Sequence, residues 1–491
     1  MLSARVLPEN NQKPCRWGGK MYRREVPGQK RLDLPYGVEL RVDNRWVQLA
    51  RIMPWERIER LYSVNFDGAN GQVAKTSRLA FAALYIQSRL NITDEETVSQ
   101  IQENPSMQYF CGFESYTTEK PFDSSLMVHF RKRITAEMMK AITEEAFASE
   151  AKKAIEKDDD DKGGNKGAGI GGSRPDAGEK KPKGTMLLDA TCCPSDIHYP
   201  TDIGLLNQAR ELTEQVIDEL HEQLLPQGHD KPRTYRKVAR KEYLRFAKRR
   251  KYTQSQLRLA IRQQLQYVRR NLETISKQIE QGARLEEIRN DLQKKLPAIS
   301  ELYLQQKQMF DERTHKVDNR IVSISQPHLR PIVRGKTNAP VEFGAKVATA
   351  NIGGFTFVIH MEFDNFSEAK YLKESAEEYN RIFGFYPRVI IGDKLYGTRE
   401  NRDYCKSKGI RLSGPRLGRK SEEIKESERV QAYQDSRERN AIEGDYGTVK
   451  RKYGLSRVMA KLHDTAQTAI SFGFFVKNME RLQGILSIEP L

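Results

Sequence analysis

The sequence predicts an α/β fold: a mixed sheet with a helical insertion, preceded by an all-α N-terminal domain. Three observations lead to this prediction. Strand-like and helix-like segments alternate in the C-terminal part, a long run of helical periodicity follows the first strand, and the N-terminal part shows amphipathic helical patterns. The length of 491 residues is enough for more than one domain and a substantial core.

Residues 1–150 are predicted to form a helical domain that binds DNA or serves assembly, although a plain helical bundle would show the same pattern. Thr93 and Glu96 form a capping-box pattern, and Asp123 is a candidate N-cap for the next helical run. Residues 151–184 are rich in Gly, Pro and charge, which predicts a flexible linker.

A helical insertion is expected at residues 204–315. Within it, residues 231–251 carry eleven basic residues against the single acid Glu242, and cations at this density pair with DNA phosphates. We expect DNA contacts from Arg245, Lys248, Arg249 and Lys251. A coiled-coil seam follows until Gly282 interrupts it, which favours an antiparallel helical hairpin. The seam residues are Leu265, Val268, Leu272, Ile275 and Ile279.

Residues 185–203 and 316–491 are predicted to form one further domain around the mixed sheet. Its first strand would be 185–191, and the strands that follow the insertion would begin with 320–325. The resulting order, one strand, the insertion, two or more strands and then alternating helices and strands, is typical of the ribonuclease H-like arrangement. We therefore expect a mixed sheet flanked by helices.

Three acidic residues of this domain are candidates for a single metal site. Asp189 and Asp393 each follow an apolar strand-like run, so each is expected at the C-terminal end of a buried strand, where side chains meet a crevice. Glu443 lies on the last predicted helix. Carboxylates from two strand ends and one helix can hold a pair of Mg²⁺ ions, because hard cations take oxygen ligands.

The last predicted helix offers more than one acid for this site. Glu443 shares its face with Arg439 and Lys450, four residues before it and seven after it. Glu438 and Asp445 are the competing acids. Asp445 projects roughly opposite Glu443, so we expect it to face solvent or to cap a neighbouring element.

Four stretches of the chain carry a resemblance, and they include "LLDATCCPSDIHYPTDIG", "IIGDKLYGTREN" and "RNAIEGDYGTVKRKYG". The stretches are residues 53–113, 187–210, 390–420 and 439–462. They resemble the DDE transposases of bacterial insertion sequences, in the branch whose catalytic domain follows a helical N-terminal domain. The resemblance implies that Asp189, Asp393 and Glu443 are the metal-binding catalytic triad and that Arg439 and Lys450 contact DNA.

The resemblance further implies a transposase that cuts the ends of its own element and joins them to target DNA. Its cofactor would be Mg²⁺, with Mn²⁺ as a substitute, at two ions per active site. Its partner would be double-stranded DNA, bound by a homodimer or a larger assembly. The alternatives are a DNA-binding protein that has lost catalysis and a metal-dependent nuclease without strand transfer. Two features depart from relatives: Ser436 stands where they have Tyr, and the insertion precedes the second Asp.

Composition supports a nucleic-acid partner. Lys and Arg number 83 against 66 Asp and Glu, a net charge of +17, and no stretch is long and apolar enough to cross a bilayer. The first residues lack the apolar centre of a signal peptide, and five scattered cysteines fit a reducing compartment, so we expect a cytoplasmic protein. The resemblance implies that this protein is bacterial and nucleoid-associated. An ATP-binding loop at 334–337 is disfavoured, because Arg330 stands where that motif needs Gly.

Zinc is disfavoured as the metal. Cys192 and Cys193 are adjacent and lack the spacing of zinc ligands, so we expect both in the core. His198 could touch DNA or be structural. Asp196 and Asp202 are expected in a loop and at a helix cap.

Overall fold

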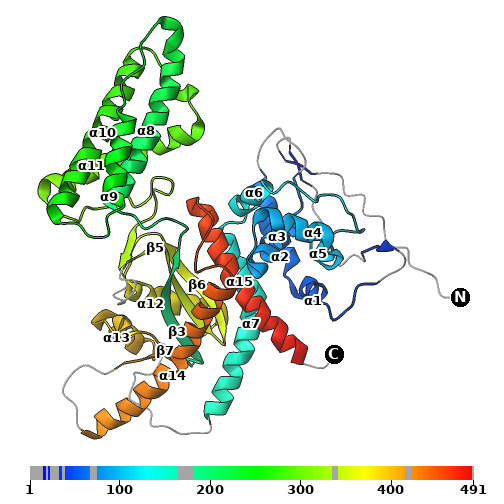
Figure 1. Ribbon diagram of the computed structural model, residues 1–491. Coiled ribbons are helices and arrows are strands. Elements are labelled where there is room, and N and C mark those ends of the chain that lie inside the picture. The colour runs from blue at the N-terminus through cyan, green and yellow to red at the C-terminus, as the bar shows by residue number, and fades with distance from the viewer. Residues whose placement is uncertain are drawn as a thin grey trace.

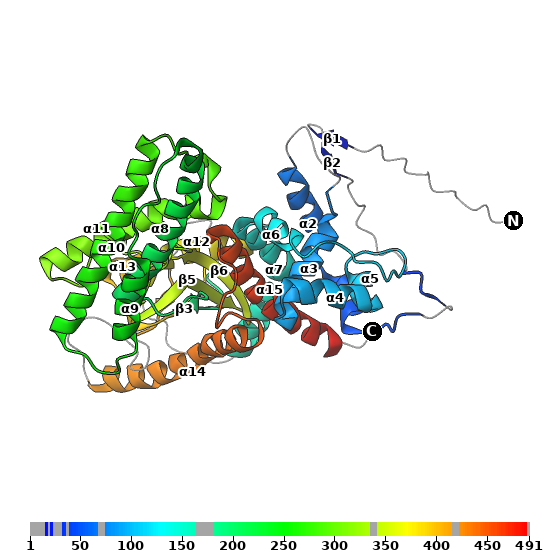
Figure 2. The same ribbon diagram turned by 45° about the horizontal axis from the view of Figure 1, so that its top comes forward.

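The computed structural model describes residues 15–17, 20–22, 32–35, 39–66, 74–163, 181–333, 341–414 and 422–488. Figure 1 shows a set of N-terminal helices, a sheet with its covering helices, and a helical bundle that stands away from the sheet. Figures 1 and 2 agree in placing the sheet between the bundle and the N-terminal helices. None of the described helices is long and apolar enough to cross a membrane.

The N-terminal part is helical, as the sequence predicts, after a small antiparallel ribbon of β1 (Cys15–Trp17) and β2 (Lys20–Tyr22). Its helices are α1 (Arg45–Ile52), α2 (Trp55–Tyr62), α3 (Ser77–Leu90), α4 (Asp94–Glu103), α5 (Pro105–Phe110), α6 (Leu126–Arg133) and α7 (Ala136–Gly163). The Thr93 side chain accepts the Glu96 N–H at 3.2 Å and caps α4, and the Asp123 side chain accepts the Ser125 N–H before α6. Thr93 is therefore confirmed as the cap of α4, whereas the N-cap of α6 is Ser125 and not Asp123.

Helix α7 differs from the prediction, because residues 151–163 continue it where a flexible linker is expected. Residues 164–180 of the predicted linker lie outside the described residues. The reason for the longer helix is tertiary packing: Ala151 and Ile155 of this extension are buried in the main core. One turn earlier, Phe147 stacks on Phe355 of the sheet, with ring centroids 5.4 Å apart. The N-terminal helices and the sheet therefore share one hydrophobic core.

Helix α15 (His463–Ile488) ends the described chain and is absent from our sequence prediction. It packs against α3, α6 and α7 and also against the sheet strand β6. Phe475 of α15 contacts the rings of Phe81 in α3 and of Phe147 in α7. This helix is apolar on several sides because it is surrounded by protein, as expected for a helix at the centre of a core.

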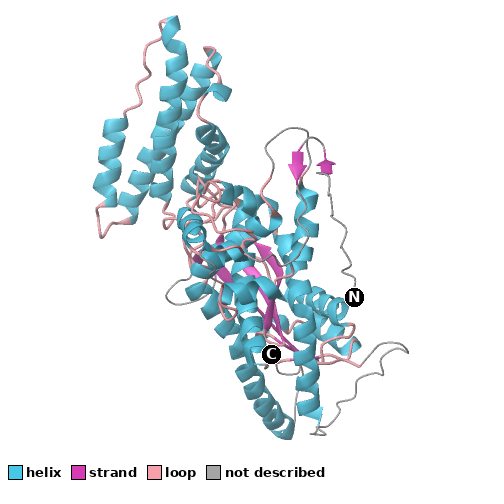
Figure 3. Cartoon of the chain, turned by 90° about the vertical axis from the view of Figure 1, so that its right-hand side faces the viewer, coloured by secondary structure: helices cyan, strands magenta, loops and turns pink. Residues whose placement is uncertain are grey.

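The sheet combines antiparallel and parallel pairing. Its strands are β3 (Thr185–Pro194), β4 (Pro331–Val333), β5 (Val341–Ile352), β6 (Phe355–Glu362), β7 (Val389–Ile391) and β8 (Arg411–Leu412). The strand order is β6-β5-β3-β7-β8, with β4 paired to the first residues of β5. Strand β3 is antiparallel to β5 and parallel to β7, which is parallel to β8. Figure 3 shows these strands enclosed by helices.

Three helices connect or cover the later strands: α12 (Leu372–Phe383), α13 (Arg399–Ser407) and α14 (Glu422–Lys452). The expected strand at 320–325 is wrong, since these residues join no ladder. Their apolar side chains are buried for another reason: Ile321 and Ile324 pack into the core of the helical bundle, and Val322 packs into the main core. This segment therefore attaches the bundle to the sheet domain.

The insertion forms a bundle of helices rather than the expected two-helix hairpin. It contains α8 (Asp202–Leu224), α9 (Arg236–Ala247), α10 (Gln254–Glu280) and α11 (Asn290–Glu312), and α10 packs against the other three. The predicted seam on α10 is largely buried, for example at Leu265 and Val268, whereas Ile279 near its end is exposed. The additional buried surface comes from α8, which supplies most of the contacts of α10.

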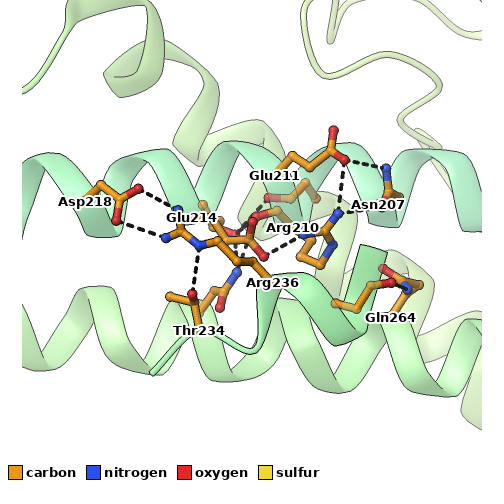
Figure 4. A network of polar contacts seen from close by, with 12 residues as sticks. Asn207, Arg210, Glu211, Glu214, Asp218, Thr234, Arg236 and Gln264 are labelled. Atoms are coloured by element: carbon orange, nitrogen blue, oxygen red, sulfur yellow. Dashed lines mark hydrogen bonds and ion pairs between the residues drawn. The ribbon is translucent and has the colours of Figure 1, made fainter. Parts of the chain in front are cut away.

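A polar network inside the bundle fixes the position of the basic segment (Figure 4). Arg210 is almost completely buried and pairs with Glu214 at 2.6 Å. Arg236, the first residue of α9, forms two hydrogen bonds of 2.9 Å with the carboxylate of Asp218 on α8. This bidentate pair anchors α9 along α8. Among the basic residues at 231–251, Arg236 is thus structural.

Candidate functional site

The pairing of β3 with β7 brings two of the predicted acids together. The strands run parallel, and Leu187 is paired with Ile391. Asp189 and Asp393 each lie two residues beyond this pair, so the two acids stand side by side where β7 ends next to β3. Asp189 lies inside β3 and not at its end as predicted, because β3 continues to Pro194 against β5.

Asp189 is the more enclosed of the two acids. Its Oδ1 accepts the N–H of Ala190 at 2.8 Å. Burial raises the pKa of Asp189 from 3.8 to about 6, because water is removed from the charged form. The nearby negative charges of Glu368 and Asp393 raise the pKa further, whereas the Ala190 N–H and the Arg439 charge lower it.

Glu443, the third candidate acid, lies on helix α14, which packs against β3 and β7. Ile442 and Val449 are fully buried on the inner face of the helix. Tyr446, also buried, forms a 2.7 Å hydrogen bond with Thr349 of β5, which is the register partner of Asp189. These contacts fix the rotation of α14, and Glu443 is left about half exposed.

Arg439 connects the helix acid with a strand acid. Its Nη2 lies 3.0 Å from Glu443 Oε1, and its Nη1 lies 3.8 Å from Asp393 Oδ1. Among the described residues no three His, Cys, Asp or Glu side chains stand close enough to hold a metal ion. The donor chemistry nevertheless fits Mg²⁺ or Mn²⁺, since all three acids offer carboxylate oxygens and two of them leave adjacent strands.

Asp445 does not face solvent or cap an element, contrary to the expectation. It accepts hydrogen bonds from Asn351 at 2.6 Å and Thr356 at 2.8 Å, and it pairs with Lys477 of α15 at 2.8 Å. The reason is that α15, which the sequence did not predict, covers this side of α14. Asp445 therefore belongs to a buried structural network, whereas Glu443 is connected with the strand acid Asp393 through Arg439.

Sequence reasoning missed Glu368. It follows β6 in a short 3₁₀ turn, and its side chain is only 13% exposed. Lys346 of β5 pairs with it at 3.0 Å and also donates to the carbonyl of Phe366 at 2.7 Å. Lys346 is the register partner of Cys192, so the pair lies next to the continuation of β3. Five residues separate Glu368 from the apolar strand β6, so the pattern of an acid directly after a strand does not select it. Its electrostatic influence on Asp189 identifies it.

The predicted DNA contacts lie in two places. Lys450 is on α14, and its positive charge acts on the Cys192 thiol, whose pKa is raised mainly by burial. The others, at the end of α9 and just after it, are exposed and form no ion pair within the described part of the chain: Arg245, Lys248, Arg249 and Lys251. Phe246 packs on Ile203 in the first turn of α8, so this basic end of α9 lies at the end of the bundle that is closest in sequence to β3.

The remaining candidates are structural. Cys192 and Cys193 are buried in β3, in agreement with the prediction. Asp196 lies in a loop and pairs with Arg457. Asp202 is not the cap of α8, because Thr201 takes that role.

Asp202 instead ties the bundle to the segment that returns to the sheet. It accepts from Gln306 of α11 at 2.8 Å and from Arg320 at 2.6 Å. His198 is exposed. Residues 334–337, where the sequence disfavours an ATP-binding loop, lie outside the described residues.

Two family models that match this chain both describe transposases. The Transposase DDE domain matches residues 390–480, which include Asp393 and Glu443, and the Transposase domain (DUF772) matches residues 38–133. An uncharacterized protein, ORF8 in the nfe locus of Rhizobium meliloti, is 31% identical over 170 residues, which are 34% of this chain and 69% of that protein. No solved structure matches the chain.

Proposed function

Because this chain belongs to the DDE transposases of insertion sequences, we propose that it cuts the ends of its own element and joins them to target DNA. The observation that carries the proposal is the register of β3 and β7, which sets Asp189 beside Asp393. Helix α14 brings Glu443 to the same edge through Arg439. The three acids are then available to one bound phosphodiester.

The fold of the sheet domain supports this function. We propose a ribonuclease H-like fold, on the evidence of three antiparallel strands, β6, β5 and β3, followed by the parallel strands β7 and β8. In this order the second acid comes from the strand next to the first acid. The helix that follows the last strand then supplies the third.

Asp189, Asp393 and Glu443 would hold Mg²⁺ or Mn²⁺, at two ions per site. Bound there, such ions would activate the attacking water or 3′-hydroxyl and stabilise the leaving 3′-oxygen. The chain itself supplies position and charge. Tyr446 and Thr349 hold α14 in place through their hydrogen bond, and the nearby cations of α14, Arg439 and Lys450, can neutralise the phosphate.

The DNA would extend from this site to the basic end of α9. The exposed cations there are free to pair with phosphates, whereas Arg236 is held by Asp218. We propose that the N-terminal helices recognise the ends of the element and that a homodimer or larger assembly forms on DNA. Trp46 of this part is buried against Tyr85 and Phe110, so it belongs to the core and not to a DNA surface.

The test uses the full-length protein with DNA that carries the ends of the element. Asp189→Ala, Asp393→Ala and Glu443→Ala should each abolish cleavage and strand transfer, because the remaining acids cannot hold both ions. Asp403→Ala is the matched control, since Asp403 is an exposed acid on α13, outside the site. Cleavage by the unsubstituted protein should require Mg²⁺ or Mn²⁺.

Each alternative function has its own outcome in this test. Binding of the ends without cleavage in either metal would favour a protein that has lost catalysis. Cleavage without joining would favour a nuclease. An active Glu443→Ala variant would show that another acid completes the site.

A further inference from the structure

We propose that Arg439 is the resident counter-ion of the acid site and that its guanidinium competes with a divalent cation for Asp393 and Glu443. The inference rests on the metal site of the proposed function and adds a role for a residue that was expected only to contact DNA. In this role Arg439 couples two events, the loading of metal and the binding of a DNA phosphate.

The geometry places the guanidinium on the acids themselves. One terminal nitrogen donates to Glu443 Oε1 at 3.0 Å, and the other lies 3.8 Å from Asp393 Oδ1. The two acids come from α14 and from the end of β7, so the guanidinium bridges a helix and a strand. Its charge also reaches Asp189. The positive charge of this one side chain thus acts on all three acids.

A divalent ion and the guanidinium compete for these carboxylates. An oxygen that accepts a guanidinium hydrogen bond has less electron density for a metal, and a fixed positive charge within about 4 Å repels the ion. Arg439 must therefore move when the metal binds. Its long side chain is one-third exposed, which leaves it room to turn outward.

The displaced guanidinium has a natural acceptor. A planar guanidinium binds phosphate oxygens through two parallel hydrogen bonds, and a phosphate at the site would receive it. Metal binding thereby releases the Arg439 guanidinium to bind phosphate. A bound phosphate in turn draws Arg439 away from the acids, where it competes with the metal. Because binding free energies are linked, each ligand strengthens the other by the same factor. Lys346 does not compete for this role, because it is held by Glu368 and the Phe366 carbonyl.

The test measures Mn²⁺ binding to the full-length protein without DNA, by electron paramagnetic resonance of the free ion. Arg439→Gln should bind Mn²⁺ about fivefold to tenfold more tightly, the gain expected when one nearby positive charge is removed from a partly hydrated site. Arg437→Gln is the matched control: the same charge is lost from the same helix, but Arg437 is exposed and has no ion pair among the described residues. Its Mn²⁺ affinity should stay within about twofold.

Two further variants sharpen the test. Arg439→Lys keeps the charge and should stay close to the unsubstituted affinity, whereas Asp393→Asn should lose most Mn²⁺ binding if the ion occupies this site. For the coupling, DNA affinity is compared with and without Ca²⁺. The ion should strengthen DNA binding of the unsubstituted protein more than that of Arg439→Gln, since the variant has no guanidinium to release.

Three results would overturn the inference. If Arg439→Gln binds Mn²⁺ no more tightly than the unsubstituted protein, Arg439 does not compete with the metal. If Arg437→Gln gains as much Mn²⁺ affinity as Arg439→Gln, the effect comes from overall charge and not from the contact with the acids. Absence of Mn²⁺ binding in every variant would remove the metal site and the proposed function with it, an outcome distinct from metal binding that ignores Arg439.

Discussion

Replacing Asp189 by Asn should make the metal-free protein more stable at neutral pH. The Asp189 carboxylate is partly buried, accepts one hydrogen bond from Ala190 and lies near the charges of Glu368 and Asp393. An Asn side chain has a similar shape, and its Oδ1 can still accept the Ala190 N–H. The substitution therefore removes the buried negative charge, which destabilises the folded state, and keeps the hydrogen bond from Ala190.

The size of the effect follows from the pKa. The increase from 3.8 to about 6 corresponds to about 3 kcal/mol, at about 1.4 kcal/mol for each pH unit. Partial access of water to the carboxylate lowers our expectation to about 1 to 3 kcal/mol. Between these pH values the folded protein binds the proton more tightly than the unfolded chain. Stability attributed to Asp189 is thus present below pH 3.8 and is lost as the pH rises through about 6.

Urea unfolding in EDTA at several pH values between 4.5 and 8 measures this difference. The difference in unfolding free energy in favour of Asp189→Asn should be small at the lowest pH and should reach its full size above pH 7. Asp393→Asn is the control, because Asp393 is 46% exposed and lies near Arg439, so its removal should not stabilise the protein. A constant difference across the pH range, or a less stable Asp189→Asn variant at pH 8, would refute the reasoning.

Two further predictions concern the network around Asp445 and the basic end of α9. Asp445→Ala should destabilise the protein by about 3 kcal/mol in urea unfolding, because Lys477 stays buried without its carboxylate partner. Adding Lys477→Met should restore part of this loss, and no restoration would show that the two residues act independently. Replacing Arg245, Lys248, Arg249 and Lys251 by Gln should flatten the slope of log DNA affinity against log salt by up to about four units, measured by fluorescence anisotropy. The control replaces two exposed cations elsewhere on the bundle, Lys277→Gln with Lys294→Gln, and should change the salt slope less. Equal slopes in all three proteins would exclude DNA contacts at the end of α9.

Local patterns determined much of the fold. The apolar runs before Asp189 and Asp393 predicted two buried strands, and strands β3 and β7 are found there. Capping residues such as Thr93 predicted helix starts correctly, because a cap depends on residues within one turn. Helical periodicity placed Glu443 on a long helix, α14. Each of these features is decided by residues close together in the chain.

The sequence misjudged features that depend on distant partners. Residues 151–163 have a composition typical of a linker and yet form helix, and the apolar segment 320–325 forms no strand. In the first case α7 packs on β6 and α15, and in the second Ile321 and Ile324 fill the bundle core. Composition and periodicity describe a segment alone and contain no information about what covers it.

The amino-acid pattern alone predicted three candidate acids and the strands and helix that carry them, because an apolar run before an acid and a helical period are local. Only the tertiary structure decided that Leu187 pairs with Ile391, so that Asp189 and Asp393 emerge side by side. It likewise decided that Arg439 bridges two acids, and that Asp445 is buried under α15 while Glu443 is left open. Strand register and helix rotation are set by contacts between residues far apart in the chain, and these contacts are formed only when the whole core is packed.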